Sequence, residues 1–186
     1  MQNKDIEKAL ETLRRGGIIL YPTDTIWGIG CDATNSDAVK RIYRLKQRAD
    51  GKAMISLVDS IDMLGKWVEN VPLAARDAIA CSPEPVSVIF DRPRGIAREL
   101  RAEDGSAAFR VVALPFIAEL IHQLDRPLVS TSANVSGQPS APTFPDISRE
   151  ILDGVDYVME YGRLRSDGAS SRILKISDNG DIITIR

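Results

Sequence analysis

A chain of 186 residues with 44% hydrophobic residues is long enough to bury a sizeable core. Its 24 basic and 26 acidic residues leave a formal charge of -2, which excludes a general cationic field that attracts nucleic acid or anionic membranes. No apolar run approaches the roughly 18 residues that a membrane-spanning helix needs, so we expect a soluble, cytoplasmic protein without membrane contact.

Helices and strands alternate along the chain. The helices expected from apolar spacing, caps and prolines cover 6–13, 35–45, a segment that begins at Ser60, a segment that begins at Pro72, 115–124 and 147–152. The strands expected from compact apolar runs cover 18–21, 53–58, 86–90, 107–112, 128–130, 157–160, 173–176 and 182–185. This alternation predicts one domain over residues 1–186 with a layered α/β architecture, in which helices flank a twisted sheet of mixed parallel and antiparallel strands.

Residues that bind metals or act as nucleophiles are few. Cys31 and Cys81 lie far apart without CxxC spacing, and His122 is the only histidine. This set does not match the ligand pattern of a zinc site, so we expect no metal held by protein ligands. We expect both thiols to be reduced and buried, and His122, within an apolar helical run, to be structural.

The stretch KRIYRLKQRADGK, residues 40–52, holds six basic residues and one acidic residue in an otherwise slightly acidic chain. At about 100° per residue, Lys46 falls on the side of the helix that should face the core. Burial of a lysine is unfavourable unless its ammonium meets an anion. Two interpretations remain open. Either the helix ends by position 46 or the side chain reaches solvent, or Lys46, Arg48 and Lys52 converge on a phosphate group.

Two polar segments directly follow apolar strands, where ligand sites of α/β proteins commonly lie. One is Thr23-Asp24-Thr25, and the other is STSANVSG at residues 130–137. Within the second segment, Ser130, Ser132 and Asn134 alternate like residues on one face of an extended chain. Their hydroxyls and the nearby backbone amides could bind an anion, and a polar turn is the alternative for this segment. For Thr23-Asp24-Thr25 taken alone, a capped turn is favoured over a ligand site.

Residues 28–33 formally match the GxGxxA pattern of dinucleotide-binding proteins. We reject that interpretation, because the helix start signal comes later, at Asn35 or Ser36, and the glycines do not directly follow the clear strand at 18–21. The chain also lacks a Walker motif, a GxSxG elbow and an HExxH motif. Arg110 lies inside an expected strand, where its side chain points either to solvent or into a cavity.

These segments, in their order along nearly the whole chain, resemble the YrdC-like family of threonylcarbamoyl-AMP synthases. The family's Pro-Thr-acid-Thr segment with a following glycine appears at 22–25 and Gly28, and its Lys-x-Arg appears at 46–48. Its Ser-Ala-Asn-x-Ser-Gly is complete at 132–137, and a later pair of hydroxyl residues appears at 170–171. The resemblance implies the compact, single-domain form of the YrdC-like fold.

The resemblance also implies a nucleotidyltransferase reaction. L-threonine, bicarbonate or carbon dioxide, and ATP give threonylcarbamoyl-AMP and pyrophosphate, with Mg2+ held mainly through the ATP phosphates. Downstream threonylcarbamoyl-transferase proteins then modify an adenosine in tRNA. The missing catalytic triad fits this chemistry, because the threonine amine attacks carbon dioxide and the resulting carbamate attacks the α-phosphate.

Position by position, the resemblance assigns Lys46 and Arg48 to catalysis and leaves no residue as a metal ligand. The implied ATP contacts are Arg48, Lys52, Ser106, Ser132, Asn134, Ser140 and Arg186. The implied threonine contacts are Thr25, Arg110, Ser130 and Ser170, with Arg110 suited to the carboxylate. Two departures from the family are Trp27, where tyrosine is common, and Leu57, where a histidine often lies near the threonine site.

A noncatalytic RNA-binding or ribosome-associated module is the alternative from another class. Such a module needs an extended basic surface with aromatic residues that stack on bases. Here the basic residues concentrate in one stretch, aromatic residues make up 5% of the chain and the net charge is negative. The sequence therefore favours the synthase.

Overall fold

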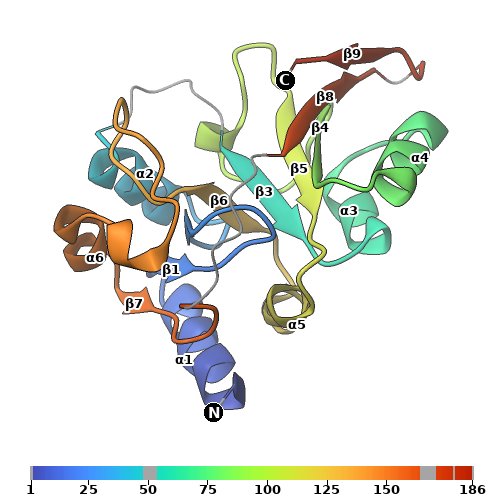
Figure 1. The fold of residues 1–186 in the computed structure, drawn as a ribbon. Helices are drawn as coiled ribbons and strands as arrows, with labels where there is room; N and C mark the ends of the chain where they lie inside the picture. Colours follow the sequence, from blue (N-terminus) through green and yellow to red (C-terminus); the bar gives the residue numbers. More distant parts are fainter. Residues whose placement is uncertain (1, 48–53, 164–170, 178, 186) are drawn as a thin grey trace.

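The computed structural model describes residues 2–47, 54–163, 171–177 and 179–185, and these residues form a nine-stranded sheet (Figure 1). The strand order is β7-β1-β2-β6-β3-β5-β4-β8-β9. Neighbours β1 and β7, β3 and β5, and β4 and β8 are parallel, and the remaining neighbours are antiparallel. The expected mixed sheet is confirmed. The strands are β1 Ile19–Tyr21, β2 Gly28–Gly30, β3 Ile55–Val58, β4 Val86–Phe90, β5 Ala107–Val111, β6 Leu128–Ser132, β7 Tyr157–Val158, β8 Arg172–Ile176 and β9 Ile182–Thr184.

Helices cover the sheet in groups (Figure 1). Helices α1 and α5 pack side by side, and α2 packs against α6 near one end of the sheet. Helix α3 contacts the central strands β3 and β5, and α4 contacts β4. The helices are α1 Gln2–Arg14, α2 Ser36–Leu45, α3 Ile61–Trp67, α4 Leu73–Cys81, α5 Pro115–Leu124 and α6 Arg149–Gly154, with short 3-10 helices η1 Arg98–Leu100 and η2 Phe144–Asp146.

Local capping explains where several helices begin. The Asn35 side chain accepts a hydrogen bond of 3.1 Å from the third residue of α2, and the Ser60 side chain accepts one of 3.1 Å from the third residue of α3. These bonds satisfy backbone N–H groups that have no partner inside the helix. Pro115 stands at the first position of α5, where its fixed φ fits the helix. The expected starts of these helices are confirmed, whereas α6 begins two residues later than the expected position 147.

Strand β2 was not among the expected strands. It pairs antiparallel with β1 on one side and with β6 on the other. A Cβ atom at Gly30 would lie 2.2 Å from the carbonyl oxygen of Val129 and 2.7 Å from the Tyr21 ring, which is closer than real Cβ atoms approach. Glycine at this position therefore permits the tight packing of β2 against its two neighbours.

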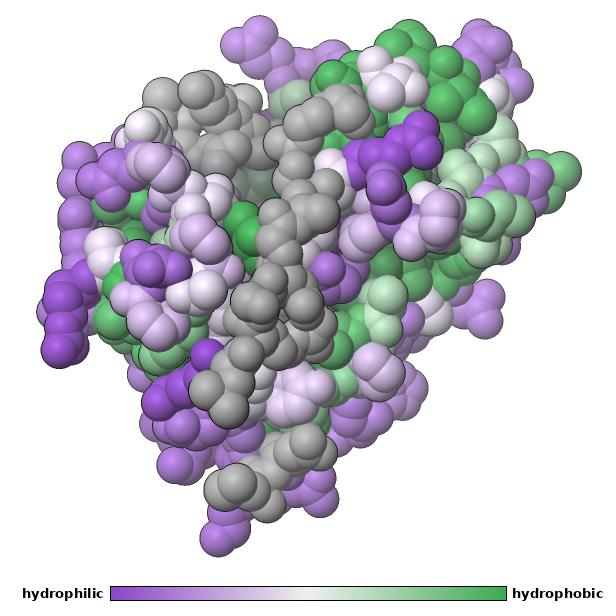
Figure 2. Space-filling view, in the orientation of Figure 1, coloured by the Kyte–Doolittle hydropathy of each residue, from purple (hydrophilic) through white to green (hydrophobic). Residues whose placement is uncertain are grey.

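The last strand of the sheet carries apolar side chains at the surface. Ile182, Ile183 and Ile185 are each more than half exposed, and Figure 2 shows green apolar surface over the β8–β9 edge at the upper right. Antiparallel pairing turns the backbone groups of alternate residues of β9 toward β8 and leaves the others facing outward. The sheet therefore ends in an edge strand that is both apolar and open.

The two cysteines differ in their environments. Cys31 is fully buried, as expected, but Cys81 is exposed, so the expectation of two buried thiols is wrong for Cys81. Cys81 is the last residue of α4, a helix of which only Ala75 is fully buried.

Among the helices that the structure describes, none is long and apolar enough to cross a membrane.

Candidate functional site

A polar cavity of about 270 Å3 opens among strands β2, β3, β5, β6 and β8. Its described lining is rich in hydroxyl groups and contains one cation, Arg110 of β5. The hydroxyl residues of the lining are Thr23, Thr25, Ser130, Thr131, Ser132, Ser140 and Ser171. Because no carboxylate lies in this described lining, the cavity is suited to an anionic ligand.

The turn after β1 supplies one wall of the cavity. The Oγ1 atoms of Thr23 and Thr25 lie 2.9 Å apart, and the Thr23 hydroxyl donates to the carbonyl of Ile26 at 2.7 Å. A Cβ atom at Gly28 would lie 3.1 Å from Cγ2 of Thr23 and 3.4 Å from Oγ of Ser130. Glycine at position 28 thus lets the turn approach β6 closely, which brings hydroxyls of two segments to one surface.

Tyr21, the last residue of β1 before this turn, links β1 to β6. Its ring is fully buried, and its hydroxyl donates to the carbonyl of Val129 at 2.9 Å. Burial raises the pKa of the Tyr21 phenol well above its ordinary value, and the positive charge of nearby Arg110 opposes that rise. The phenol therefore stays neutral and serves as a fixed link between β1 and β6.

Arg110 and Asp24 form a buried ion pair beside the cavity. The side chains are 3% and 9% exposed, and Nε of Arg110 lies 3.7 Å from Oδ2 of Asp24. In the parallel pairing of β3 and β5, Arg110 lies opposite Leu57, which is fully buried and apolar. The expectation that Arg110 points either to solvent or into a cavity is resolved, because its side chain lines the cavity.

Lys46 connects the end of α2 to the segment after β6. It is 1% exposed, and its ammonium donates to the carbonyl oxygens of Ser132 and Asn134, the latter at 2.6 Å. In return, the carbonyl of Lys46 accepts a hydrogen bond of 2.8 Å from the backbone N–H of Ser136. We call this arrangement the Lys46 bracket. Helix α2 ends at Leu45, which agrees with the interpretation that the helix ends by position 46. The buried ammonium is compensated by the dipoles of two backbone carbonyls.

Asn134 shapes the turn that follows β6. Its side-chain amide donates to the carbonyls of Val135 and Gln138 at 3.0 and 2.7 Å. Its Oδ1 atom is buried, and no described residue forms a hydrogen bond with it. The side chain therefore holds the turn together, and it is not among the described residues that line the cavity.

The structure brings together only part of the expected site. Of the expected ligand contacts, Thr25, Arg110, Ser130, Ser132 and Ser140 line the cavity. Ser106 is not in the described lining, and its hydroxyl instead donates to Asp104 at 2.6 Å. The expected residues Arg48, Lys52, Ser170 and Arg186 lie outside the described residues.

Several described lining residues were not predicted individually. Trp27 and Met54 are mostly buried apolar residues of the lining, and Ile173 contributes from β8. Apolar residues of this kind carry no sequence signal that separates a cavity wall from the core. Ser171 did carry a signal, because it is the second residue of the expected hydroxyl pair; its Oγ lies 3.0 Å from Oγ of Ser87.

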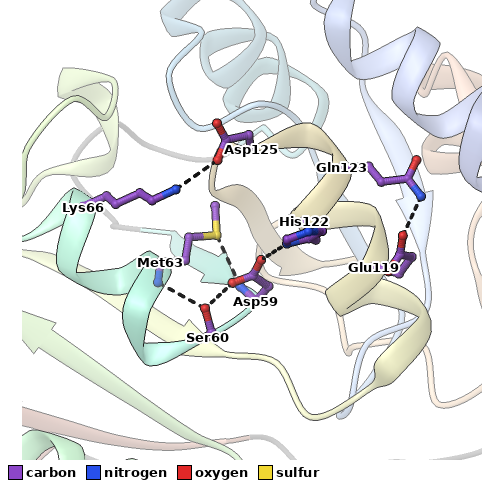
Figure 3. A network of polar contacts seen from close by, with 8 residues as sticks. All are labelled: Asp59, Ser60, Met63, Lys66, Glu119, His122, Gln123 and Asp125. Atoms are coloured by element: carbon purple, nitrogen blue, oxygen red, sulfur yellow. Dashed lines mark hydrogen bonds and ion pairs between the residues drawn. The ribbon is translucent and has the colours of Figure 1, made fainter.

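His122 belongs to a separate polar network (Figure 3). Its ring Nδ1 lies 3.1 Å from Oδ2 of Asp59, and the other carboxylate oxygen, Oδ1, accepts a hydrogen bond from Ser60 at the start of α3. Lys66 and Asp125 form an ion pair of 3.3 Å nearby. None of these five residues is in the described cavity lining, and the network ties α5 to α3. The expected structural role of His122 fits this position.

Comparisons with known sequences agree on one family, and comparisons with solved structures show the same fold. The family model Sua5_yciO_yrdC, described as "Telomere recombination", matches residues 11–186. The threonylcarbamoyl-AMP synthase of Hahella chejuensis is 36% identical over 169 residues, which cover 90% of this chain and 91% of that protein. The crystal structure of E. coli YciO matches this structure with a TM-score of 0.82 and 24% sequence identity, and the match covers 100% of this chain and 89% of the YciO chain. The crystal structure of P. abyssi Sua5 complexed with L-threonine matches with a TM-score of 0.82 and 23% sequence identity, and the match covers 97% of this chain and 53% of the Sua5 chain.

Proposed function

The chain belongs to the Sua5/YciO/YrdC family, and on this premise we propose that it is an L-threonylcarbamoyl-AMP synthase. The observation that supports this most is the hydroxyl-lined cavity with Arg110 as its one described cation. A guanidinium presents paired donors that match a carboxylate, and hydroxyls suit phosphate oxygens and the threonine side chain.

The reaction needs no nucleophile from the protein. The amine of L-threonine loses a proton and attacks carbon dioxide, which gives a carbamate and releases a second proton. A carbamate oxygen then attacks the α-phosphorus of ATP, the bond to the β-phosphate breaks, and pyrophosphate leaves. The protein therefore has to align the two substrates, exclude water from a labile mixed anhydride and stabilise the leaving pyrophosphate.

The threonine and nucleotide contacts divide between two sides of the cavity. Arg110 binds the threonine carboxylate, with Thr25, Ser130 and Ser170 around the remaining polar groups. The nucleotide lies against the segment after β6. Its proposed contacts are Arg48, Lys52, Ser106, Ser132, Asn134, Ser140 and Arg186. Arg48 meets the phosphates, and Lys46 supports catalysis by holding the backbone of this segment in place through the bracket.

Magnesium enters the site with ATP. The described cavity lining offers hydroxyls but no carboxylate, and Mg2+ prefers carboxylate, phosphate and water oxygens. The ATP phosphates would hold the ion and supply most of its ligands, and the ion would neutralise charge on the leaving pyrophosphate.

The product implies further partners. Threonylcarbamoyl-AMP is a mixed anhydride that hydrolyses easily, so a transferase must consume it for tRNA modification. We place this work in the cytoplasm and assign it to a single domain over residues 1–186.

The test is pyrophosphate release by the purified protein with ATP, Mg2+, bicarbonate and L-threonine. We expect release to require both threonine and bicarbonate, to fall when serine replaces threonine, and to accompany a product with the mass of threonylcarbamoyl-AMP. Release that continues unchanged without threonine would refute the proposed function.

A further inference from the structure

Asp24 carries a buried charge that the reaction as described does not use. Both carboxylate oxygens are buried and have no hydrogen-bond partner among the described residues. A buried carboxylate without hydrogen bonds is strongly unfavourable unless a cation compensates it. The cation that pairs with Asp24 among the described residues is the guanidinium of Arg110, whose Nε lies 3.7 Å from Oδ2. This distance exceeds a hydrogen bond, so the pair is held by charge at close range.

The guanidinium of Arg110 has two distinct sides. Its Nε atom is buried, has no hydrogen-bond partner in the part of the chain that the structure describes, and faces Asp24. The terminal nitrogens are not among the buried unpartnered atoms, and Arg110 lines the cavity. The fork of terminal N–H groups is therefore the side that is presented to a ligand, while the carboxylate lies behind it.

From this geometry we propose that Asp24 is a positioning residue. Its carboxylate holds the Arg110 guanidinium in the orientation that presents both terminal nitrogens to a ligand carboxylate. The inference rests on the proposed function, which makes L-threonine the source of that carboxylate. Asp24 does not contact the ligand itself, because both of its oxygens are buried. Asp24 acts through Arg110: its carboxylate compensates the buried positive charge of the guanidinium, which lies beside apolar neighbours such as Leu57.

The test compares two ligands that differ only at the group in question. L-threonine has a carboxylate, and L-threoninol has a hydroxymethyl group in its place. In calorimetry with the full chain, Asp24→Asn should weaken L-threonine binding about 10- to 100-fold, the loss that a misplaced contact group causes. The same variant should change L-threoninol binding less than about twofold, because threoninol does not use the fork.

A double-mutant cycle separates positioning from general damage. If Asp24 acts through Arg110, Asp24→Asn should cause no further loss of threonine binding in an Arg110→Gln background. The matched control is Asp125→Asn, which removes a carboxylate on the surface at the end of α5 and should leave both affinities unchanged. Equal weakening of threonine and threoninol by Asp24→Asn would overturn the proposal, and so would unchanged threonine binding.

Two further outcomes are informative. Should Asp24→Asn fail to fold, Asp24→Glu keeps the charge but moves it by one methylene, so threonine binding should weaken several-fold while threoninol binding is kept; equal losses would contradict positioning. Wild-type protein that does not bind threonine would refute the proposed function, and the role of Asp24 with it. Wild-type binding with an unaffected Asp24→Asn variant refutes the positioning role alone.

Discussion

The Lys46 bracket provides a sharp test of how the site is held together. Replacement of Lys46 by methionine keeps most of the apolar stem but removes the ammonium that donates to the carbonyls of Ser132 and Asn134. Each hydrogen bond from a charged donor contributes about 1.5–3 kcal/mol, and the two together about 3–6 kcal/mol. Burial of the ammonium offsets part of this gain. We expect Lys46→Met to lower the free energy of unfolding by roughly 2–4 kcal/mol.

Urea denaturation measures this loss, and another lysine of α2 supplies the control. Lys40 is exposed and forms a 3.3 Å ion pair with Glu99, so Lys40→Met should cost no more than about 1 kcal/mol. The bracket also holds the backbone of the cavity wall, so Lys46→Met should reduce threonine-dependent pyrophosphate release more than Lys40→Met does. A Lys46→Met protein as stable as the Lys40→Met protein would refute the reasoning.

Three further predictions concern packing, pH and thiol exposure. Gly30→Ala would place a methyl group 2.2 Å from a carbonyl oxygen of β6 and should lower the free energy of unfolding by more than about 3 kcal/mol. Gly65→Ala, in open space in α3, should raise the free energy of unfolding by about 1 kcal/mol. Equal effects of the two substitutions in urea denaturation would contradict this packing argument. Asp156 forms an ion pair of 2.9 Å with Arg41 of α2 and accepts a hydrogen bond from the backbone N–H of Ile18. Burial raises the pKa of the Asp156 carboxyl, but these two partners hold it below its ordinary value of 3.8, so the stability that separates wild type from Asp156→Asn should be constant above about pH 5 and shrink as the pH falls below 3.8; a difference that grows in acid would contradict the ion pair. A thiol reagent should label Cys81 rapidly in native protein and Cys31 only after denaturation, because Cys31 is buried and burial raises the pKa of its thiol; two rapidly reacting thiols in native protein would be the opposite result.

The starts of α2 and α3 were predictable because their causes are local. Asn35 and Ser60 satisfy backbone N–H groups within three residues, so the sequence alone indicates the start of α2 and of α3. Strand β2 has no such local cause. Glycine weakens a strand in isolation, and Gly30 is needed only because a carbonyl from β6, about 100 positions later in the chain, passes close to it.

In the candidate site, too, some residues could be predicted from the sequence, whereas contacts between distant segments could not. Ser132 could be proposed from a motif, because a motif records which side chains are present, and Arg110 could be proposed from the family resemblance. The bracket could not be anticipated, because the acceptors of the Lys46 ammonium are backbone carbonyls, and every residue has one. Exposure of Cys81 depends on which face of α4 packs on the sheet, and that short helix has too few buried residues to give a clear apolar stripe.

The strand order has a consequence for how the protein is made. Strand β6 lies between β2 and β3, and it is the only link between these two strands in the sheet order of the described residues. Because β6 is Leu128–Ser132, the two halves of the cavity cannot join until the ribosome has released about two thirds of the chain. Until then β2 and β3 each expose an unpaired edge, which is a template for pairing with another chain. Nascent chains that stop short of β6 should therefore depend on chaperones, whereas longer ones can close the sheet themselves.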